Sequence, residues 1–245
     1  MAQVLQVGNQ TITTDKVITL LASYQMLPQF LREVIVDQAI VSFTCTPEEK
    51  ASACQQFYEK YQLTSESERQ EWLDLYEMTP EQLEALATRG QRIEKFKQAT
   101  WGHKLGSYFL RRKKQLDQAV YSLIRVKDME LARELYFRIK EGEQSFAELA
   151  REYSQGSEAL NSGMQSPVER SKIPPSLAQM LFVSQPGELW PPTRLGEWVV
   201  IVRLEKLIPA QLDEAMRQQL LDELFDRWLQ EQLTKLANGG LISLN

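Results

Sequence analysis

The apolar residues of this 245-residue chain change their spacing twice, and this change limits the folds that the chain can adopt. From residue 14 to about residue 115 they recur with the 3.6-residue period of amphipathic helices. Residues 119–126 form a run rich in β-branched and aromatic side chains, which is typical of a strand. After residue 209 the helical period returns. Helical segments at both ends and a mixed segment between them predict an α+β protein.

The first 115 residues contain clear signals for where elements begin. Gly8 and Asn9 separate two short alternating runs, Val4–Val7 and Thr11–Thr13, which predicts a small hairpin. Three hydroxyl residues each precede an acid or amide three positions later, the pattern of a capping box at a helix start: Thr46 with Glu49, Ser65 with Glu68, and Thr79 with Gln82. The long helix that begins at Pro80 is expected to bend or break near Gly90, Gly102 or Gly106.

These patterns divide the chain into three parts. Residues 1–117 form a helical domain, residues 118–208 form an α+β module with a small antiparallel sheet, and residues 209–245 form a C-terminal helix. In the middle segment, Ser145 and Glu148 form a fourth capping box, and the nearly continuous apolar run from Trp198 to Leu204 predicts a buried strand. The last helix carries an apolar stripe too wide to face water. We expect it to pack on the N-terminal helices; the alternative is that it lies alone on the α+β module.

Composition excludes several classes of function. The net charge of −5 gives no attraction to nucleic acid or to an anionic membrane, and no apolar stretch is long enough to span a bilayer. With one histidine (His103) and two cysteines, the chain offers no usual Cys/His zinc site, and we expect no metal and no cofactor. The N-terminus does not resemble a secretion signal. The sequence therefore predicts a cytoplasmic protein without membrane insertion.

Residues 121–206 resemble the parvulin family of peptidyl-prolyl cis-trans isomerases, also called rotamases. The resemblance is carried by the order and spacing of three stretches: residues 126–135, residues 145–154 (Ser-Phe-Ala-Glu-Leu-Ala-Arg-Glu-Tyr-Ser), and Phe182 with Gln185-Pro186-Gly187-Glu188 and residues 202–205. The flanking helical segments resemble the SurA and PrsA group of foldases, in which helices before and after the parvulin module form one chaperone domain. The resemblance implies a domain that binds polypeptides.

The positions at which parvulins keep their polar site residues are changed in this chain. The alignment places Leu123 at the first family histidine, Gly156 at the cysteine or aspartate, and Trp198 or Val200 at the second histidine. No catalytic residue is therefore predicted. The residues that we expect to line an apolar peptide groove are Leu123, Ile173, Leu177, Phe182, Trp198 and Val200. The alternative is that Leu123 and Val200 only fill the core of the module.

Three functions follow from these observations. The first is a chaperone-like protein that binds unfolded or proline-containing polypeptides and has a degraded catalytic site. The second is an active isomerase that uses groups other than histidine, with Tyr121, Ser122 or Ser157 as candidate donors. The third is a non-catalytic adaptor or assembly subunit, whose basic run at Arg111, Arg112, Lys113 and Lys114 meets an acidic protein partner.

Overall fold

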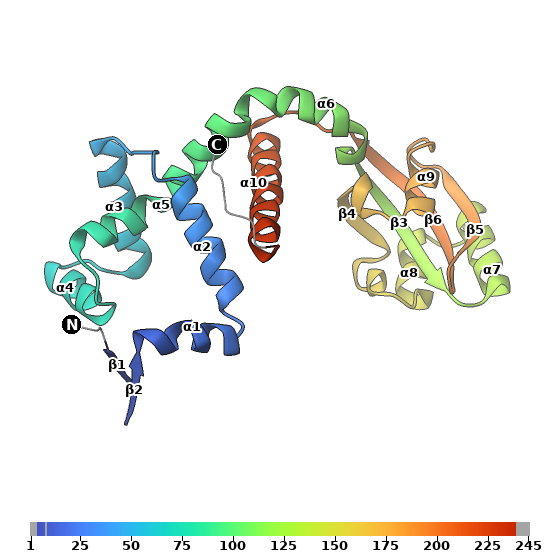
Figure 1. Cartoon of the computed structure of the whole chain (residues 1–245). Coiled ribbons are helices and arrows are strands. Elements are labelled where there is room, and N and C mark those ends of the chain that lie inside the picture. Colours follow the sequence, from blue (N-terminus) through green and yellow to red (C-terminus); the bar gives the residue numbers. More distant parts are fainter. Residues whose placement is uncertain (1–3, 8, 239–245) are drawn as a thin grey trace. The chain divides into compact units, whose positions relative to one another are not determined.

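A computed structural model describes residues 4–7 and 9–238 of the chain. The chain forms two compact units (Figure 1). The first, here called the helical unit, is built from residues 1–105 and 214–245. The second, the sheet unit, is built from residues 106–213. The boundary at residue 105 lies at the start of α6 (Leu105–Leu116), earlier than the position that the change of periodicity indicates.

The helical unit begins with the predicted hairpin, in which β1 (Val4–Val7) pairs antiparallel with β2 (Gln10–Thr13); Gly8 lies outside the described residues. The helices that follow are α1 (Thr14–Ser23), α2 (Leu27–Ala39), α3 (Pro47–Tyr61), α4 (Glu66–Leu75) and α5 (Pro80–Trp101). The long helix passes Gly90 without interruption and breaks at Gly102, where a 3₁₀ turn (Gly102–Lys104) leads into α6. None of the described helices is long and apolar enough to cross a membrane.

All four predicted capping boxes are present. Thr46, Ser65, Thr79 and Ser145 each accept a hydrogen bond from the backbone N–H three residues later, and the acid or amide at that position accepts one from the N–H of the cap. Each box satisfies two backbone donors that would otherwise lack a partner at the start of the helix. The helix starts could therefore be located from local sequence alone.

The C-terminal helix α10 (Glu214–Ala237) belongs to the helical unit and packs against α2 and α5. Its Phe225 and Leu229 are buried against Ile35, Val36 and Ile40 of α2 and the residue after it. Aromatic rings from α5 and α10, including Trp101 and Trp228, surround this core. The wide apolar stripe of the last helix is thus accounted for by burial against the N-terminal helices.

A buried lysine also ties α10 to α5. The Nζ atom of Lys97 lies 2.6 Å from both Glu94 Oε1 and Asp222 Oδ1, and its side chain is 8% exposed. Burial lowers the pKa of Lys97, but the hydrogen bonds to Asp222 and Glu94 outweigh this effect and leave the pKa above 10.5. The ammonium group stays charged because both carboxylates replace the water that it loses.

The sheet unit is an antiparallel four-stranded sheet with strand order β4-β3-β6-β5. Its strands are β3 (Gln118–Val126), β4 (Met164–Glu169), β5 (Leu189–Leu195) and β6 (Trp198–Ile208). Besides α6, which precedes the sheet, the helices are α7 (Met129–Lys140), α8 (Phe146–Tyr153) and α9 (Pro175–Leu181), with short 3₁₀ turns at Ser157–Asn161 and Arg170–Lys172. The predicted α+β class with a small antiparallel sheet is confirmed.

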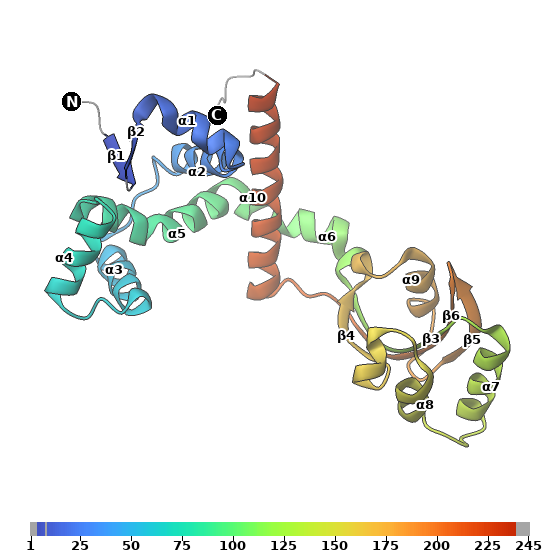
Figure 2. The same ribbon diagram turned by 90° about the horizontal axis from the view of Figure 1, so that it is seen from below.

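Helices cover both faces of the sheet, with α9 on one side and α7 and α8 on the other (Figure 2). Successive side chains of a strand point to opposite faces. On β3, Leu123 therefore packs toward α9, whereas Ile124 packs toward α7 and α8. This double coverage explains why the central strand β6 reads as a continuous apolar run in the sequence.

Both edge strands contain proline, and neither was predicted as a strand. Pro167 lies in β4, and Pro191 and Pro192 lie in β5, where the pairing with β6 shifts between Trp190 and Thr193. Proline has no N–H to donate to a neighbouring strand and is therefore found mainly at sheet edges. These prolines explain why the two strands were not predicted from residue propensities.

Candidate functional site

A cleft of about 400 Å³ opens on the α9 face of the sheet. Four of the six predicted groove residues line it: Leu123, Leu177, Trp198 and Val200. The other lining residues are Arg125, Pro174, Ser176, Arg194, Leu195 and Gly196. The lining contains no histidine, cysteine, aspartate or glutamate.

Strand geometry brings these residues together. Leu123 and Arg125 are two positions apart on β3, as are Trp198 and Val200 on β6, so that each pair faces the same side. Arg125 pairs directly with Val200 across the two strands. Because alternate residues share a face, both candidates for the second family histidine, Trp198 and Val200, reach the cleft.

Leu123, Leu177 and Val200 are nearly buried, with exposed fractions of 8%, 4% and 3%. They belong to the core beneath α9 and at the same time form the floor of the cleft. Trp198 is half-buried and forms part of the wall. Core filling and cleft lining are therefore compatible roles for the same side chains.

The structure places the other two predicted groove residues elsewhere. Ile173 lines a separate depression with Arg170 and Ala178. Phe182 packs on the edge of the core, and the guanidinium of Arg170 lies 4.7 Å from its ring centroid. Phe182 follows Leu177 by five positions, about 500° of helical rotation, so the two side chains point in different directions. The structure thus brings four of the six predicted groove residues together at one cleft.

Arg125, which lines the cleft, is paired with the buried Glu158 behind it, and the sequence singled out neither residue. Arg125 Nε donates to Glu158 Oε1 at 3.0 Å, and Arg125 Nη2 bonds to Glu158 Oε2. The side chain of Glu158 is 1% exposed, whereas that of Arg125 is 32% exposed. Ser154 Oγ donates to Glu158 Oε1 at 2.6 Å and accepts the backbone N–H of Arg125 at 2.9 Å.

The loop that carries Glu158 is anchored to β3 by backbone hydrogen bonds. Gln155 N donates to Arg125 O at 2.8 Å, Gly163 N donates to Glu158 O at 2.8 Å, and Leu123 N donates to Gly163 O at 2.9 Å. Gly163 has a φ of 83°, and a Cβ there would lie 3.0 Å from Leu123 O. Only glycine closes this loop without strain.

Gly156, the position of the family cysteine or aspartate, lies beside the ion pair. A Cβ at this position would collide with the carboxylate of Glu158 and the guanidinium of Arg125. The ion pair therefore occupies the space that a side chain at position 156 would need. No local signal in the sequence marks this pair, because Arg125 and Glu158 are 33 positions apart.

Arg125 and Glu158 both stay ionised at neutral pH. Burial raises the pKa of Glu158, but hydrogen bonds from Arg125 and Ser154 outweigh burial and hold the pKa below its ordinary value of 4.5. The hydrogen bond to Glu158 in turn raises the pKa of Arg125. Both groups are ionised, and their charges cancel.

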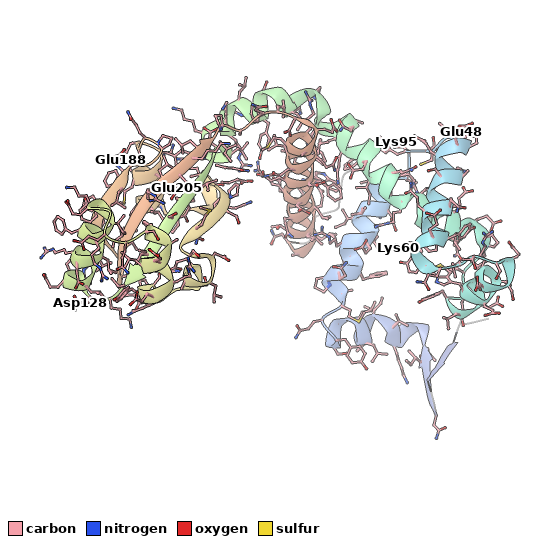
Figure 3. The ribbon with its side chains drawn as sticks, turned by 180° about the vertical axis from the view of Figure 1, so that it is seen from behind. Glu48, Lys60, Lys95, Asp128, Glu188 and Glu205 are labelled. Atoms are coloured by element: carbon pink, nitrogen blue, oxygen red, sulfur yellow. The ribbon has the colours of Figure 1, made fainter. Side chains whose placement is uncertain are left out.

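The three hydroxyl candidates for an unusual isomerase are dispersed. Ser122 faces away from the cleft and donates to Glu205 on β6 at 2.5 Å; Figure 3 labels Glu205 there. Ser157 is exposed and does not line the cleft. Tyr121 is buried in the core beneath α9, and burial raises the pKa of its hydroxyl. The structure does not gather them into one site.

The basic run lies on α6. Arg111 and Lys114 are exposed, whereas Lys113 pairs with Asp117 at 3.2 Å and Arg112 donates to the hydroxyl of Tyr108 at 3.0 Å. Arg112 and Lys113 thus contact neighbouring side chains of the same chain, and the structure gives no support to an acidic protein partner. Among the residues that the structure describes, no three His, Cys, Asp or Glu side chains are grouped so that they could hold a metal ion.

Comparisons with known proteins find one family model and several solved structures that resemble this chain. Residues 125–206 match the family model described as rotamase, PPIC-type PPIase domain. No curated protein matches the chain in sequence.

Three solved structures illustrate the likeness. PrsA from Bacillus anthracis is 18% identical, with 87% of this chain and 99% of that chain covered and a TM-score of 0.48. PrsA from Bacillus cereus is 18% identical, with coverages of 98% and 93% and a TM-score of 0.49. The parvulin domain of PpiD from E. coli is 27% identical, with coverages of 41% and 97% and a TM-score of 0.35. The sheet unit of this chain, over residues 125–206, is a rotamase domain of the PPIC, or parvulin, type.

Proposed function

We propose that this protein is a chaperone-like polypeptide-binding protein whose rotamase domain binds proline-containing segments with little or no isomerase activity. The observation that carries this proposal is the lining of the cleft. The resemblance places Leu123, Gly156 and Trp198 or Val200 at the positions where the family keeps two histidines and a cysteine or aspartate. The cleft retains an apolar floor and a half-buried tryptophan.

The chemistry of prolyl isomerisation supports this separation of binding from catalysis. Rotation about the peptide bond crosses a barrier of about 18–20 kcal/mol and requires no bond to be broken. A catalyst must bind the twisted bond more tightly than the planar one. An apolar cleft binds both forms through the same contacts, so it gives affinity without much acceleration.

Binding can be tested with a fluorescein-labelled proline-containing peptide titrated with the full chain and followed by anisotropy. Trp198→Ala should weaken binding roughly tenfold or more, because a tryptophan in a cleft wall is a typical hot spot. Trp190→Ala is the matched control. Trp190 is also half-buried and lies in the same domain, but it bonds to Ser184 and does not line the cleft.

Catalysis is tested separately by measuring cis-trans exchange of the same peptide by NMR, with and without the full chain. We expect binding without acceleration over the buffer blank. Acceleration by the wild type that disappears in Trp198→Ala would show an active isomerase and refute the catalytic half of the proposal. Absence of binding, or equal loss in both tryptophan variants, would refute the binding half.

A further inference from the structure

The most unusual feature of the cleft is that its arginine is paired with a carboxylate that is almost completely withdrawn from water. Burying an ion pair costs free energy that the attraction between the ions often does not recover. Stability alone therefore gives a poor reason for this arrangement. Its geometric consequence is that Glu158 and Ser154 fix the position of Arg125 at the cleft.

A guanidinium group has five N–H donors. Glu158 takes a bond from Nε and a bond from Nη2, which are on one edge of the group. The Nη1 edge is directed away from that carboxylate. Arg125 lines the cleft and is one third exposed, and its Cζ atom lies 5.9 Å from the centroid of the Trp198 ring. Donors therefore remain for a ligand in the cleft.

The charge of the pair indicates which kind of acceptor suits it. Because Glu158 cancels the charge of Arg125, the pair offers strong donors without a net charge. Such a group favours a neutral acceptor over a carboxylate or phosphate. The neutral acceptor that every polypeptide carries is its backbone carbonyl.

We infer that Arg125 is the polar anchor of the cleft: its guanidinium donates hydrogen bonds to a backbone carbonyl of the bound polypeptide, and Glu158 is the positioning residue that orients it. This inference rests on the proposed function and adds to it the group that sets the register of the bound chain. The apolar floor supplies affinity, and Arg125 decides which peptide unit lies at the ion pair.

The test uses the full chain and the same labelled peptide. The double variant Arg125→Met/Glu158→Gln removes the donors and the charge together, so that no buried charge is left without a partner. The matched control is Arg138→Met/Glu134→Gln, which removes another Arg–Glu pair of the same domain, on α7. We expect roughly tenfold weaker binding for the first variant, the loss of one hydrogen bond from a charged donor, and no change for the control.

A second measurement separates a contact with the ligand from a structural role. A set of peptides is prepared in which one backbone carbonyl at a time is replaced by a thiocarbonyl, a poorer acceptor. The wild type should bind one member of the set several-fold more weakly than the parent peptide, and the double variant should bind these two equally.

The outcomes distinguish the inference from the proposed function. If the wild type binds no peptide, the proposed function fails. If the wild type binds but the double variant binds equally well, or keeps the full discrimination against the thiocarbonyl, the inference about Arg125 fails and the proposed function remains.

Discussion

Gly156 offers a sharp test of how the site is built. Its backbone is extended, with φ of −109° and ψ of 177°, a conformation that alanine adopts without strain. The nearest obstacle to Gly156→Ala is therefore the ion pair, because the new methyl group would overlap the carboxylate of Glu158 and the guanidinium of Arg125. We expect the substitution to force the pair apart.

The cost follows from what the displaced groups lose. Removing one partner of a fully buried pair costs about 3–5 kcal/mol. Arg125 keeps contact with water, and Glu158 keeps its bond from Ser154, so we expect a smaller loss of about 2–3 kcal/mol in the free energy of unfolding. In a Glu158→Ala background the carboxylate is gone, and the partly exposed side chain of Arg125 no longer has the bonds to Glu158 that hold it beside Gly156. Gly156→Ala should then be neutral or stabilise by up to about 1 kcal/mol, because alanine restricts the unfolded chain.

The assay is urea unfolding of the full chain, with hydrogen exchange of β3 peptides as the probe for the sheet unit. Gly106→Ala is the control. Gly106 lies in α6 with no atom within 4 Å of an added Cβ, so this variant should not be destabilised. If Gly156→Ala costs the same with and without Glu158, the ion pair is not what excludes a side chain, and the reasoning is wrong.

Three further predictions concern other parts of the chain. The pKa of Glu158 is lower in the folded chain than its ordinary 4.5. Its contribution to stability is therefore present above pH 4.5 and is lost as the pH falls through the folded pKa. Urea midpoints of Glu158→Gln should depend less on pH in the acidic range than those of the wild type. Leu229→Ala, at a fully buried position of α10, should cost about 2–5 kcal/mol in the helical unit while exchange in β3 stays unchanged; equal loss of protection in β3 would contradict the division into two units. The carboxyl of Glu68 should titrate by NMR with a pKa of about 2, because the backbone of Ser65 and the hydroxyl of Thr64 bond to it, and Ser65→Ala should raise that value.

Much of the fold was predictable because its signals are local. A capping box involves residues only three positions apart, and all four were located correctly. The hairpin at the N-terminus depends on a two-residue turn, and the buried strand β6 on an uninterrupted apolar run. The edge strands were missed for the same reason: Pro167 and Pro191 disfavour strands locally, and only pairing with β3 and β6 makes them strands.

The site was only partly predictable because its polar centre depends on contacts across the fold. Leu123, Leu177 and the two β6 candidates followed from the resemblance and do line the cleft. Arg125 and Glu158 are 33 positions apart, and nothing in their local sequence shows that they meet. The bounds of α9 also limited the groove prediction, because the residue at which a helix begins decides the direction in which each of its side chains points.

The prolines at the two sheet edges have a consequence for how this sheet can pair with other extended chains. A free strand edge pairs readily with any extended segment, and such pairing can continue into aggregates. Pro167 on one edge and Pro191 with Pro192 on the other interrupt the rows of N–H groups that an incoming strand would use. Under the proposed function, a client would be held through its side chains and one peptide unit in the cleft, and it would leave without being built into the sheet.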